Sequence, residues 1–339
     1  MPKLKTILVG FGNIAEEMAH DSIKAKSTAY ATHAQVLRDH PDFDWVAVVD
    51  PSAEKRECAK SRWGVNTVVP DLQSLPISLQ PDLAVIATTP AYRAPVIEQL
   101  PALKGVLVEK PLGKDIKSAR EFSTLCQKRN IKAQINFWRR GDSTSRALAD
   151  GGLKSRIGRP QTAFGVYGNG FRNNAVHMID YTRMLLGEVS CAQALGTPRA
   201  AAGLPIADDV LVPFSLTLEN GALVTFHSLD FGFYRENSLE IWGEKGCVSI
   251  LQEGWRLLSH SLHQHGTLGG AREVDFDQAE RLKSGAGHAF YDMYDNLANA
   301  VKGNSSLWSS AGSALRNEEI LEAVLCSAEN EFKPTLLSI

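Results

Sequence analysis

The first 137 residues alternate short apolar runs with longer stretches of mixed polarity. The apolar runs have the length and composition of strands buried on both faces, and they cover residues 5–9, 45–50, 82–90, 105–111 and 131–137. Stretches of helical length lie between most of these runs, for example residues 53–63 and 115–130. Strands that alternate with helices predict a doubly wound parallel sheet.

The pattern changes after about residue 150. Residues 149–160 are rich in glycine and basic residues, which is typical of a connector. Beyond them, apolar and polar residues alternate as in half-exposed strands at 160–168, 210–231, 238–252 and 255–262. Two short segments, 219–222 and 244–247, have the residues of hairpin turns. This part of the chain therefore predicts an open mixed or antiparallel β-sheet.

The end of the chain predicts two helices, over residues 286–302 and 309–329, after a polar, glycine-rich loop or lid at 263–287. We expect two domains, in the classes α/β and α+β. We expect residues 1–135 to form the domain with the doubly wound parallel sheet, and residues 136–339 to form the domain with the open sheet. The two closing helices are candidates to pack back on the first domain.

Composition narrows the class of protein. The 339 residues carry 36 lysines and arginines against 38 aspartates and glutamates, so there is no basic surface for nucleic acid or anionic membrane. The five cysteines are widely spaced and form no CxxC pair, which argues against disulfides and zinc sites. The N-terminal apolar run is too short for a signal or a membrane span. We interpret the protein as cytoplasmic, and the apolar face of the open sheet indicates a homodimer or homotetramer.

The motif GFGNIA, residues 10–15, follows the first strand and fits the dinucleotide-binding pattern G-x-G-x-x-G/A. Gly10 permits a tight turn, Gly12 lets the backbone approach a pyrophosphate, and Ala15 permits close packing of helix and strand. We expect the motif to open a helix whose N-terminus holds phosphate. The alternative is an ordinary glycine turn.

Asp50 ends the second predicted strand. An acid at this position accepts hydrogen bonds from the adenosine ribose hydroxyls and repels a 2′-phosphate, so it favours NAD over NADP. Asp50 follows Gly10 by 40 residues, twice the spacing of ~20 residues usual in this fold. An insert around residues 24–37 accounts for the excess. The alternative is an acidic N-cap of the next helix.

Two further motifs carry groups suited to proton transfer. Lys110 ends a predicted parallel strand, where ligands of such sheets bind, although a surface lysine paired with Glu109 is an alternative. Asn173, His177 and Asp180 are spaced to share one face of a helix, and the alternative is a solvated turn with a structural histidine. Two such side chains are too few for a metal, so we expect no metal site.

The segment VLVEKPLG, together with GFGNIA and the N-x-x-x-H-x-x-D helix, resembles the Gfo/Idh/MocA family of oxidoreductases along nearly the whole chain. The resemblance implies that the first domain binds NAD(P) and that the second holds a sugar, cyclitol or nucleotide-linked sugar. It implies Lys110 and His177 as catalytic residues. It implies cofactor contacts from Gly10, Phe11, Gly12, Asn13, Ile14, Asp50, Thr88, Thr89, Pro90, Tyr92, Glu109 and Lys110.

The candidate substrate contacts are Lys110, Arg139, Arg140, Asn173, His177 and Asp180. Either arginine is a candidate to meet a phosphate or carboxylate. The chain departs from the family at Asn173, where members carry aspartate, and at Ala94, where many carry histidine. Asn173 either orients His177 or recognises the substrate.

The reaction expected from this resemblance is hydride transfer between NAD and a carbon bearing a secondary hydroxyl, with the crevice between the domains bringing Lys110 and His177 together. Two alternatives remain open. One is an NADP-linked imine or enal reductase, and the other is a non-catalytic NAD-binding sensor or assembly module.

Overall fold

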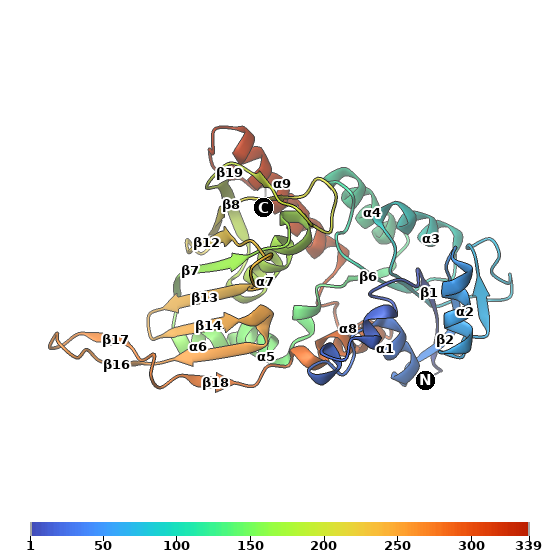
Figure 1. The fold of residues 1–339 in the computed structure, drawn as a ribbon, viewed down its shortest axis with the longest axis horizontal. Coiled ribbons are helices and arrows are strands. Elements are labelled where there is room, and N and C mark those ends of the chain that lie inside the picture. Colours follow the sequence, from blue (N-terminus) through green and yellow to red (C-terminus); the bar gives the residue numbers. More distant parts are fainter. Residues whose placement is uncertain (1, 338–339) are drawn as a thin grey trace. The chain divides into compact units, whose positions relative to one another are not determined.

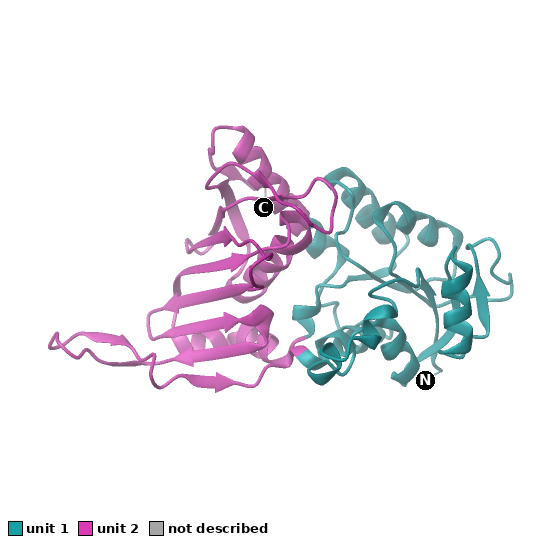
Figure 2. Ribbon diagram, viewed as in Figure 1, with its two compact units in different colours: residues 1–141, 287–315 teal, residues 142–286, 316–339 magenta. Residues whose placement is uncertain are grey.

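The computed structural model describes residues 2–337, which form two compact units (Figure 2). Unit 1 takes the chain up to residue 141 together with residues 287–315. Unit 2 takes residues 142–286 together with the chain from 316 onward. Residues 1 and 338–339, at the outer ends of the two expected domains, lie outside the described residues.

Unit 1 is built on a parallel sheet with the strand order β3-β2-β1-β4-β5-β6 (Figure 1). Its strands are β1 (Leu4–Val9), β2 (Phe43–Val49), β3 (Thr67–Val69), β4 (Leu83–Ile86), β5 (Gly105–Val108) and β6 (Lys132–Ile135). Each pairs in parallel with its neighbours, so the predicted doubly wound sheet is confirmed. The sequence did not predict β3, because three half-buried residues give no periodic pattern.

The order of the strands predicts a crevice at the carboxyl ends of the central strands of this sheet. β1 lies between β2 and β4, and Val9 is level with Val49 on one side and Ile86 on the other. From β2 the chain continues to β3, away from β1 on one side, and from β4 it continues to β5, away from β1 on the other side. The loops that follow β2 and β4 therefore diverge. Ligands of open α/β sheets bind outside the carboxyl ends of the strands at such a point.

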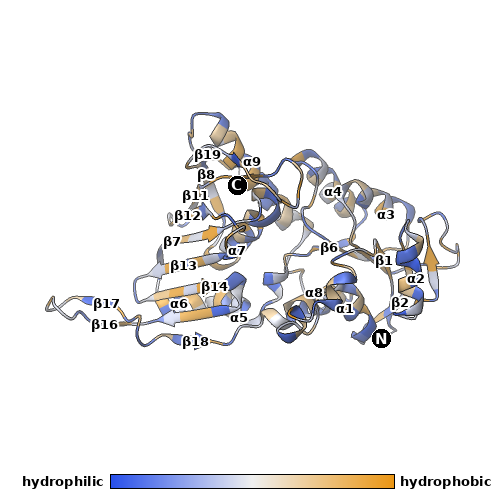
Figure 3. Ribbon diagram, in the orientation of Figure 1, coloured by the Kyte–Doolittle hydropathy of each residue, from blue (hydrophilic) through white to orange (hydrophobic). Residues whose placement is uncertain are grey.

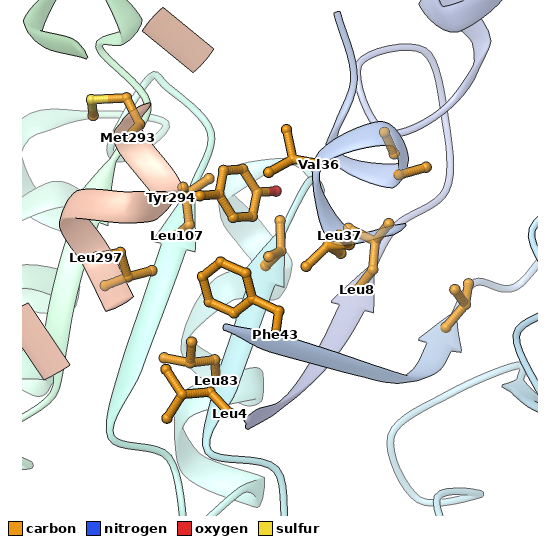
Figure 4. Packing of buried hydrophobic residues seen from close by; sticks show 14 of the residues in the cluster. Leu4, Leu8, Val36, Leu37, Phe43, Leu83, Leu107, Met293, Tyr294 and Leu297 are labelled. Atoms are coloured by element: carbon orange, nitrogen blue, oxygen red, sulfur yellow. The ribbon is translucent and has the colours of Figure 1, made fainter. Parts of the chain in front are cut away.

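Helices from distant parts of the sequence bury the apolar side chains of this sheet. They are α1 (His33–Asp39), α2 (Ala53–Ser61), α3 (Arg93–Gln99), α4 (Ile116–Lys128) and α8 (Ala286–Val301). Helices α1 and α8 pack into one cluster with the strands, shown in Figure 4 with the labelled side chains Leu4, Leu8, Val36, Leu37, Phe43, Leu83, Leu107, Met293, Tyr294 and Leu297. Burial of each large apolar side chain contributes about 1.5–3 kcal/mol, so α8 is an integral part of unit 1.

The expected helix directly after the glycine motif does not form. Residues 13–16 are turns, followed by the short 3-10 helices η1 (Glu17–His20) and η2 (Lys24–Lys26). Asp21 interrupts a regular helix, because its Oδ1 accepts the backbone N–H groups of Ile23 and Lys24 at 2.9 and 3.1 Å.

The chain returns to the glycine motif at α1. The N–H groups of His33 and Ala34 donate to the carbonyls of Ile14 and Ala15 at 3.3 and 2.9 Å. Thr32 begins the helix with a capping box. The insert is therefore an excursion over residues 16–32, and residues 33–37 of the expected insert at 24–37 belong to the helix.

Unit 2 contains a mixed sheet with the order β18-β15-β14-β13-β7-β12-β11-β8-β19 (Figure 1). Its strands are β7 (Pro160–Tyr167), β8 (Val189–Ala194), β11 (Phe214–Leu218), β12 (Leu223–Ser228), β13 (Ser238–Gly243), β14 (Cys247–Leu251), β15 (Arg256–His260), β18 (Glu280–Leu282) and β19 (Thr335–Leu336). Strands β7 and β12 pair in parallel, and the other neighbouring pairs in the described chain are antiparallel. The expected open mixed sheet and both hairpin turns are confirmed.

One face of this sheet is covered and the other is open. The helical segments of the unit are α5 (Ser143–Ala147), η5 (Leu148–Gly152), α6 (Leu153–Ile157), η6 (Phe171–Ala175), α7 (Val176–Leu186), η7 (Gln252–Gly254) and most of α9 (Ala311–Glu329). Along β7, Ala163 and Tyr167 are buried, whereas Phe164 is 45% exposed and stacks on Trp242. In the hydropathy colouring, hydrophobic residues are prominent on strands such as β7 and β14 (Figure 3).

Two segments of unit 2 differ from the expectation. Residues 149–160 are largely helical rather than a connector, because Leu153 and Ile157 share a helix face and are both buried. The expected loop at 263–287 contains the hairpin strands β16 (Leu262–Gln264) and β17 (Arg272–Val274) and the edge strand β18. Backbone pairing forms these strands. Because most of their side chains are polar and exposed, the sequence shows no alternation of apolar and polar residues there.

The two short strands β9 (Arg199–Ala200) and β10 (Val210–Leu211) form a separate antiparallel pair. The cysteines are free thiols. Within residues 2–337 the helices are too short or too polar to cross a bilayer.

Tyr167 provides a test of the packing in unit 2. Its hydroxyl donates to the Val212 carbonyl at 2.7 Å and accepts the Val212 N–H at 2.9 Å, and the side chain is fully buried. We expect Tyr167→Phe to lower the free energy of unfolding by about 2–3 kcal/mol, because two backbone groups lose their partner. Urea denaturation measures the change. Tyr234→Phe, at a position 62% exposed, is the control, and equal stability of both variants would refute the assignment.

Candidate functional site

A cavity of about 700 Å³ lies within unit 1 at the carboxyl ends of β1, β2 and β4. Its volume is in the range of small-molecule and cofactor sites. It is lined by the predicted residues Gly10, Phe11, Gly12, Asp50, Thr88, Thr89 and Tyr92. The sequence did not predict Asp71 and Gln73, which also line it and follow the short strand β3. The other predicted cofactor residues, Asn13, Ile14, Pro90, Glu109 and Lys110, are not part of its lining.

The two glycines of the motif serve different purposes. Gly10 has a φ of +87°, and a Cβ there would lie 2.8 Å from Thr88 Cγ2 and 2.9 Å from the Ala87 carbonyl oxygen. Both its conformation and its surroundings therefore require glycine. At Gly12, no atom of the described chain beyond the two neighbouring residues lies within 4 Å of the Cβ position. Its bare backbone faces open space, where a ligand can approach it closely.

Asp50 links the glycine turn to the end of β2. Its Oδ2 accepts the Phe11 N–H at 2.7 Å, its Oδ1 accepts the Ser52 N–H at 2.8 Å, and the residue is 8% exposed. The N-cap of α2 is Ser52, whose side chain accepts the Lys55 N–H, so Asp50 is not the helix cap. Each carboxylate oxygen keeps a further lone pair for a ligand hydroxyl.

A buried polar atom in the cavity wall has no partner. Thr88 Oγ1 makes no hydrogen bond within residues 2–337. Such an atom is costly unless a ligand or water satisfies it. The glycine backbone for a pyrophosphate, the Asp50 carboxylate for ribose hydroxyls and this hydroxyl together fit a dinucleotide.

Arg93 joins the loop after β4 to the loop after β5. The arginine is 2% exposed, and its guanidinium donates to the carbonyls of Pro111, Leu112 and Thr88, the last two at 3.1 and 3.2 Å. The sequence analysis noted the missing histidine at Ala94 and overlooked the arginine beside it. The signal was a charged residue directly before the apolar residues at the start of this helix, α3.

Glu109 and Lys110 follow β5, and the Lys110–Pro111 peptide bond is cis. The Glu109 N–H donates to the Ile86 carbonyl at 3.1 Å, which places both residues at the edge of the sheet where β4 also ends. Glu109 Oε1 accepts the Asn136 amide at 2.6 Å and lies 3.1 Å from His33 Nε2.

The pKa of Glu109 lies below its ordinary value. Burial alone would raise this pKa, but the hydrogen bond and charge of His33, the Asn136 amide and the charge of Lys110 outweigh it. Glu109 is therefore a carboxylate at neutral pH. The sequence analysis missed His33 and Asn136, although His33 was marked by its place in the apolar start of α1.

The two predicted arginines lie in η4 (Trp138–Gly141), directly after β6. Arg139 is 4% exposed, and its guanidinium carbon lies 4.6 Å from the centre of the Trp138 ring. Arg140 Nη1 donates to the Trp308 carbonyl at 3.2 Å. Arg139 is held in the interior of unit 1, and the half-buried Arg140 is the more accessible of the two.

In unit 2, η6 leads directly into α7 and carries Asn173 four residues before His177, and both are half-buried. Asn173 Nδ2 donates to the Asn169 carbonyl at 2.9 Å. The carboxylate of Asp209 accepts the N–H groups of residues 171, 172 and 173 at 3.1, 2.9 and 3.0 Å. Asp209, which the sequence analysis did not identify, thus neutralises the positive end of this helical segment.

Asp180 lies apart from the other two polar residues of the predicted face. It is 1% exposed, and its Oδ1 accepts the amide of Asn317 in α9 at 2.8 Å. The Asn317 oxygen in turn accepts from Arg183 at 2.6 Å. Asp180 therefore has an interior contact, which joins α7 to α9. No group of three or more His, Cys, Asp or Glu side chains suited to a metal ion occurs within residues 2–337.

Comparison with known proteins gives matches in both halves of the chain. Residues 4–137 match the sequence model of an oxidoreductase family with an NAD-binding Rossmann fold, and residues 158–335 match the C-terminal alpha/beta domain of that family. The 1,5-anhydro-D-fructose reductase of Ensifer adhaerens is 23% identical over 261 residues, which cover 71% of this chain and 74% of that protein. Inositol 2-dehydrogenase 4 of Saccharopolyspora erythraea is 28% identical over 239 residues, covering 62% and 69%.

Solved structures show the same fold. The WlbA dehydrogenase of Bordetella pertussis, solved in complex with NADH and UDP-GlcNAcA, superposes with a TM-score of 0.74 at 18% identity, covering 99% of each chain. Because the two family models together span most of the sequence, the chain belongs to the Gfo/Idh/MocA family of NAD(P)-binding oxidoreductases.

Proposed function

We propose that the protein is an NAD-dependent dehydrogenase that transfers hydride to or from a carbon bearing a secondary hydroxyl of a sugar, cyclitol or nucleotide-linked sugar. The observation that carries the choice of cofactor is Asp50, an acid in the wall of the cavity beside the glycine turn. The substrate class is supported by the names of the relatives, an anhydrofructose reductase and an inositol dehydrogenase.

The charges around Asp50 favour NAD over NADP. A 2′-phosphate on the adenosine ribose would meet the Asp50 carboxylate, and Asp71 adds a second acid to the same cavity. Arg56 is the basic side chain at this loop, and its Nη1 donates to the carbonyls of Asp50 and Pro51, each at 2.8 Å. One nitrogen of its guanidinium is therefore engaged with the backbone.

Lys110 and His177 are the proposed proton-transfer groups. The nicotinamide, when bound, supplies or accepts the hydride, and the protein moves the proton of the substrate hydroxyl. Lys110 stabilises negative charge on that oxygen, and His177 accepts or donates its proton. Asn173 offers an amide in place of the family's aspartate, so it orients a neighbour or a substrate hydroxyl without adding charge.

The open face of the sheet in unit 2 supports a proposal about assembly. Phe164 and Leu223 are 45% and 46% exposed on adjacent strands, and Phe164 stacks on Trp242. An apolar surface of this kind is typical of subunit contacts. We propose that a second copy of the chain covers it in a homodimer or homotetramer.

Calorimetric titration of the purified protein with NAD and NADP tests the cofactor. We expect NAD to bind more tightly, and we expect Asp50→Ala to narrow the difference because the repulsion of the 2′-phosphate is removed. Asp44→Ala changes an exposed acid of the same strand and serves as the control. Equal or tighter binding of NADP to the unmodified protein would contradict the proposal and favour an NADP-linked imine or enal reductase.

The two glycines allow stability and binding to be separated. We expect Gly12→Ala to keep the thermal midpoint of the wild type and to weaken NAD binding, because its Cβ occupies open space beside the cavity. Gly10→Ala should unfold at a lower temperature, since its φ and its neighbours exclude a side chain. Unchanged NAD affinity in a stable Gly12→Ala variant would place the cofactor elsewhere.

Lys110→Met and His177→Ala test the proton-transfer groups. We expect each to lower turnover by roughly 10²–10⁴-fold, the span usual for a positioned acid or base, with little change in NAD affinity. Initial rates of NADH formation across sugars, cyclitols and nucleotide sugars provide the measurement. Near-normal turnover in both variants would rule out their role. Binding of NAD by the wild type without turnover on any of these substrates would favour a non-catalytic module.

A further inference from the structure

We propose that His33 and Tyr294 form a positioning pair that holds the Glu109 carboxylate in one orientation beside Lys110. The inference rests on the proposed function and on the contact between Glu109 and the cofactor that the family resemblance implies. The two residues come from α1 and α8, which the sequence separates by more than 250 positions and the core of unit 1 packs together. Neither residue belongs to a motif of the sequence.

The three side chains form a continuous hydrogen-bonded chain. Tyr294 Oη lies 2.5 Å from His33 Nδ1, and His33 Nε2 lies 3.1 Å from Glu109 Oε1. Burial raises the pKa of Tyr294 well above its ordinary value, so its hydroxyl keeps its proton and can donate. Because Glu109 is a carboxylate, it must accept from Nε2–H. The imidazole of His33 joins the other two side chains, because Nε2–H donates to Glu109 and Nδ1 shares a hydrogen bond with the Tyr294 hydroxyl.

A second donor converges on the same carboxylate oxygen. Asn136, at the end of β6, donates its amide to Glu109 Oε1 at 2.6 Å, and its own Oδ1 is buried without a partner within residues 2–337. The side chain of Glu109 is 15% exposed. The carboxylate is thus buried for the most part and anchored through Oε1 by two donors.

The burial of the pair distinguishes positioning from proton conduction. His33 is 0% exposed and Tyr294 is 1% exposed. The Phe290 ring covers the imidazole, with 5.0 Å between ring centres. Since the chain ends at a buried phenol, it offers no exit for a proton to water. Its effect is to fix the orientation of Glu109 and to keep it ionised in a buried place, where an unsupported carboxylate would be costly.

The closest structural controls lie on the same two helices. His40, the C-cap of α1, is 2% exposed and stacks on Tyr291 of α8, and neither makes a hydrogen bond to Glu109. His40→Leu and Tyr291→Phe therefore repeat the chemical change of His33→Leu and Tyr294→Phe on the same two helices. They report what the loss of a buried histidine, whose Nδ1 accepts the Asp42 N–H at 3.2 Å, and of a neighbouring phenol does when the contacts of Glu109 are kept.

The test is a double-mutant cycle on the full chain, with NAD affinity measured by calorimetry. We expect His33→Leu and Glu109→Gln each to weaken NAD binding about ten-fold, and the double variant to be no weaker than either one, because the first change removes the anchor of the carboxylate and the second removes the carboxylate itself. We expect His33→Gln, whose amide can still donate to Glu109, to restore most of the affinity. Tyr294→Phe should weaken binding and Tyr291→Phe should not.

Additive losses in the double variant, or equal losses in the His40 and Tyr291 controls, would overturn the inference.

If Glu109→Gln binds NAD like the wild type, the proposed cofactor contact of Glu109 fails instead. A crystal structure of the His33→Leu variant then decides the positioning role without NAD. We expect the Glu109 carboxylate to leave its place beside Asn136 there, and to keep it in His33→Gln. A carboxylate that stays in place in both variants would refute the positioning role, and Tyr294→Phe provides the same comparison if His33→Leu does not fold.

Discussion

The backbone of the chain leaves β1 at Gly10 in a space that admits no side chain. A Cβ at this position would overlap the Ala87 backbone and the Thr88 side chain at the end of β4. The positive φ of Gly10 is a second, separate reason why a residue with a side chain would be strained there. This contact holds the first loop against the fourth strand, and the Phe11 N–H bonds the same loop to Asp50 at the end of β2. The cavity, its exposed glycine backbone and its acid are built around this close approach, while the pairing of β1 with β2 and β4 keeps the three strand ends level.

Buried polar residues connect the elements that carry the candidate chemistry. In unit 1, Arg93 ties the loops after β4 and β5 together through backbone carbonyls, and His33 anchors Glu109. In unit 2, Asp209 binds the N–H groups at the start of the segment that carries Asn173 and His177. Each of these side chains is costly to bury alone, and each is satisfied by several partners. These buried polar side chains therefore fix the orientation of the loop residues that they bind. Hydrophobic packing alone would leave such loops mobile.

The excursion over residues 16–32 shows how an insertion is accommodated without loss of the fold. The hydrogen bonds from His33 and Ala34 to Ile14 and Ala15 close the excursion at its base, so the glycine turn and α1 keep their relation. The same closure brings His33 to Glu109. The glycine motif is therefore hydrogen-bonded to α1, a helix that begins further along the chain, instead of leading directly into a helix.

Local patterns in the sequence were sufficient for the alternating strands and helices of unit 1, the hairpin turns of unit 2, the glycine motif and the acid at Asp50, because each depends on neighbours within a few residues. Tertiary structure decided what depends on distant partners. The helix expected after Gly12 gave way to turns, Asp180 turned inward to Asn317, and β17 and β18 formed from polar residues by pairing along an edge. His33, Arg93 and Asp209 show the same limit, since a buried charge or imidazole is explained only by the groups that fold around it.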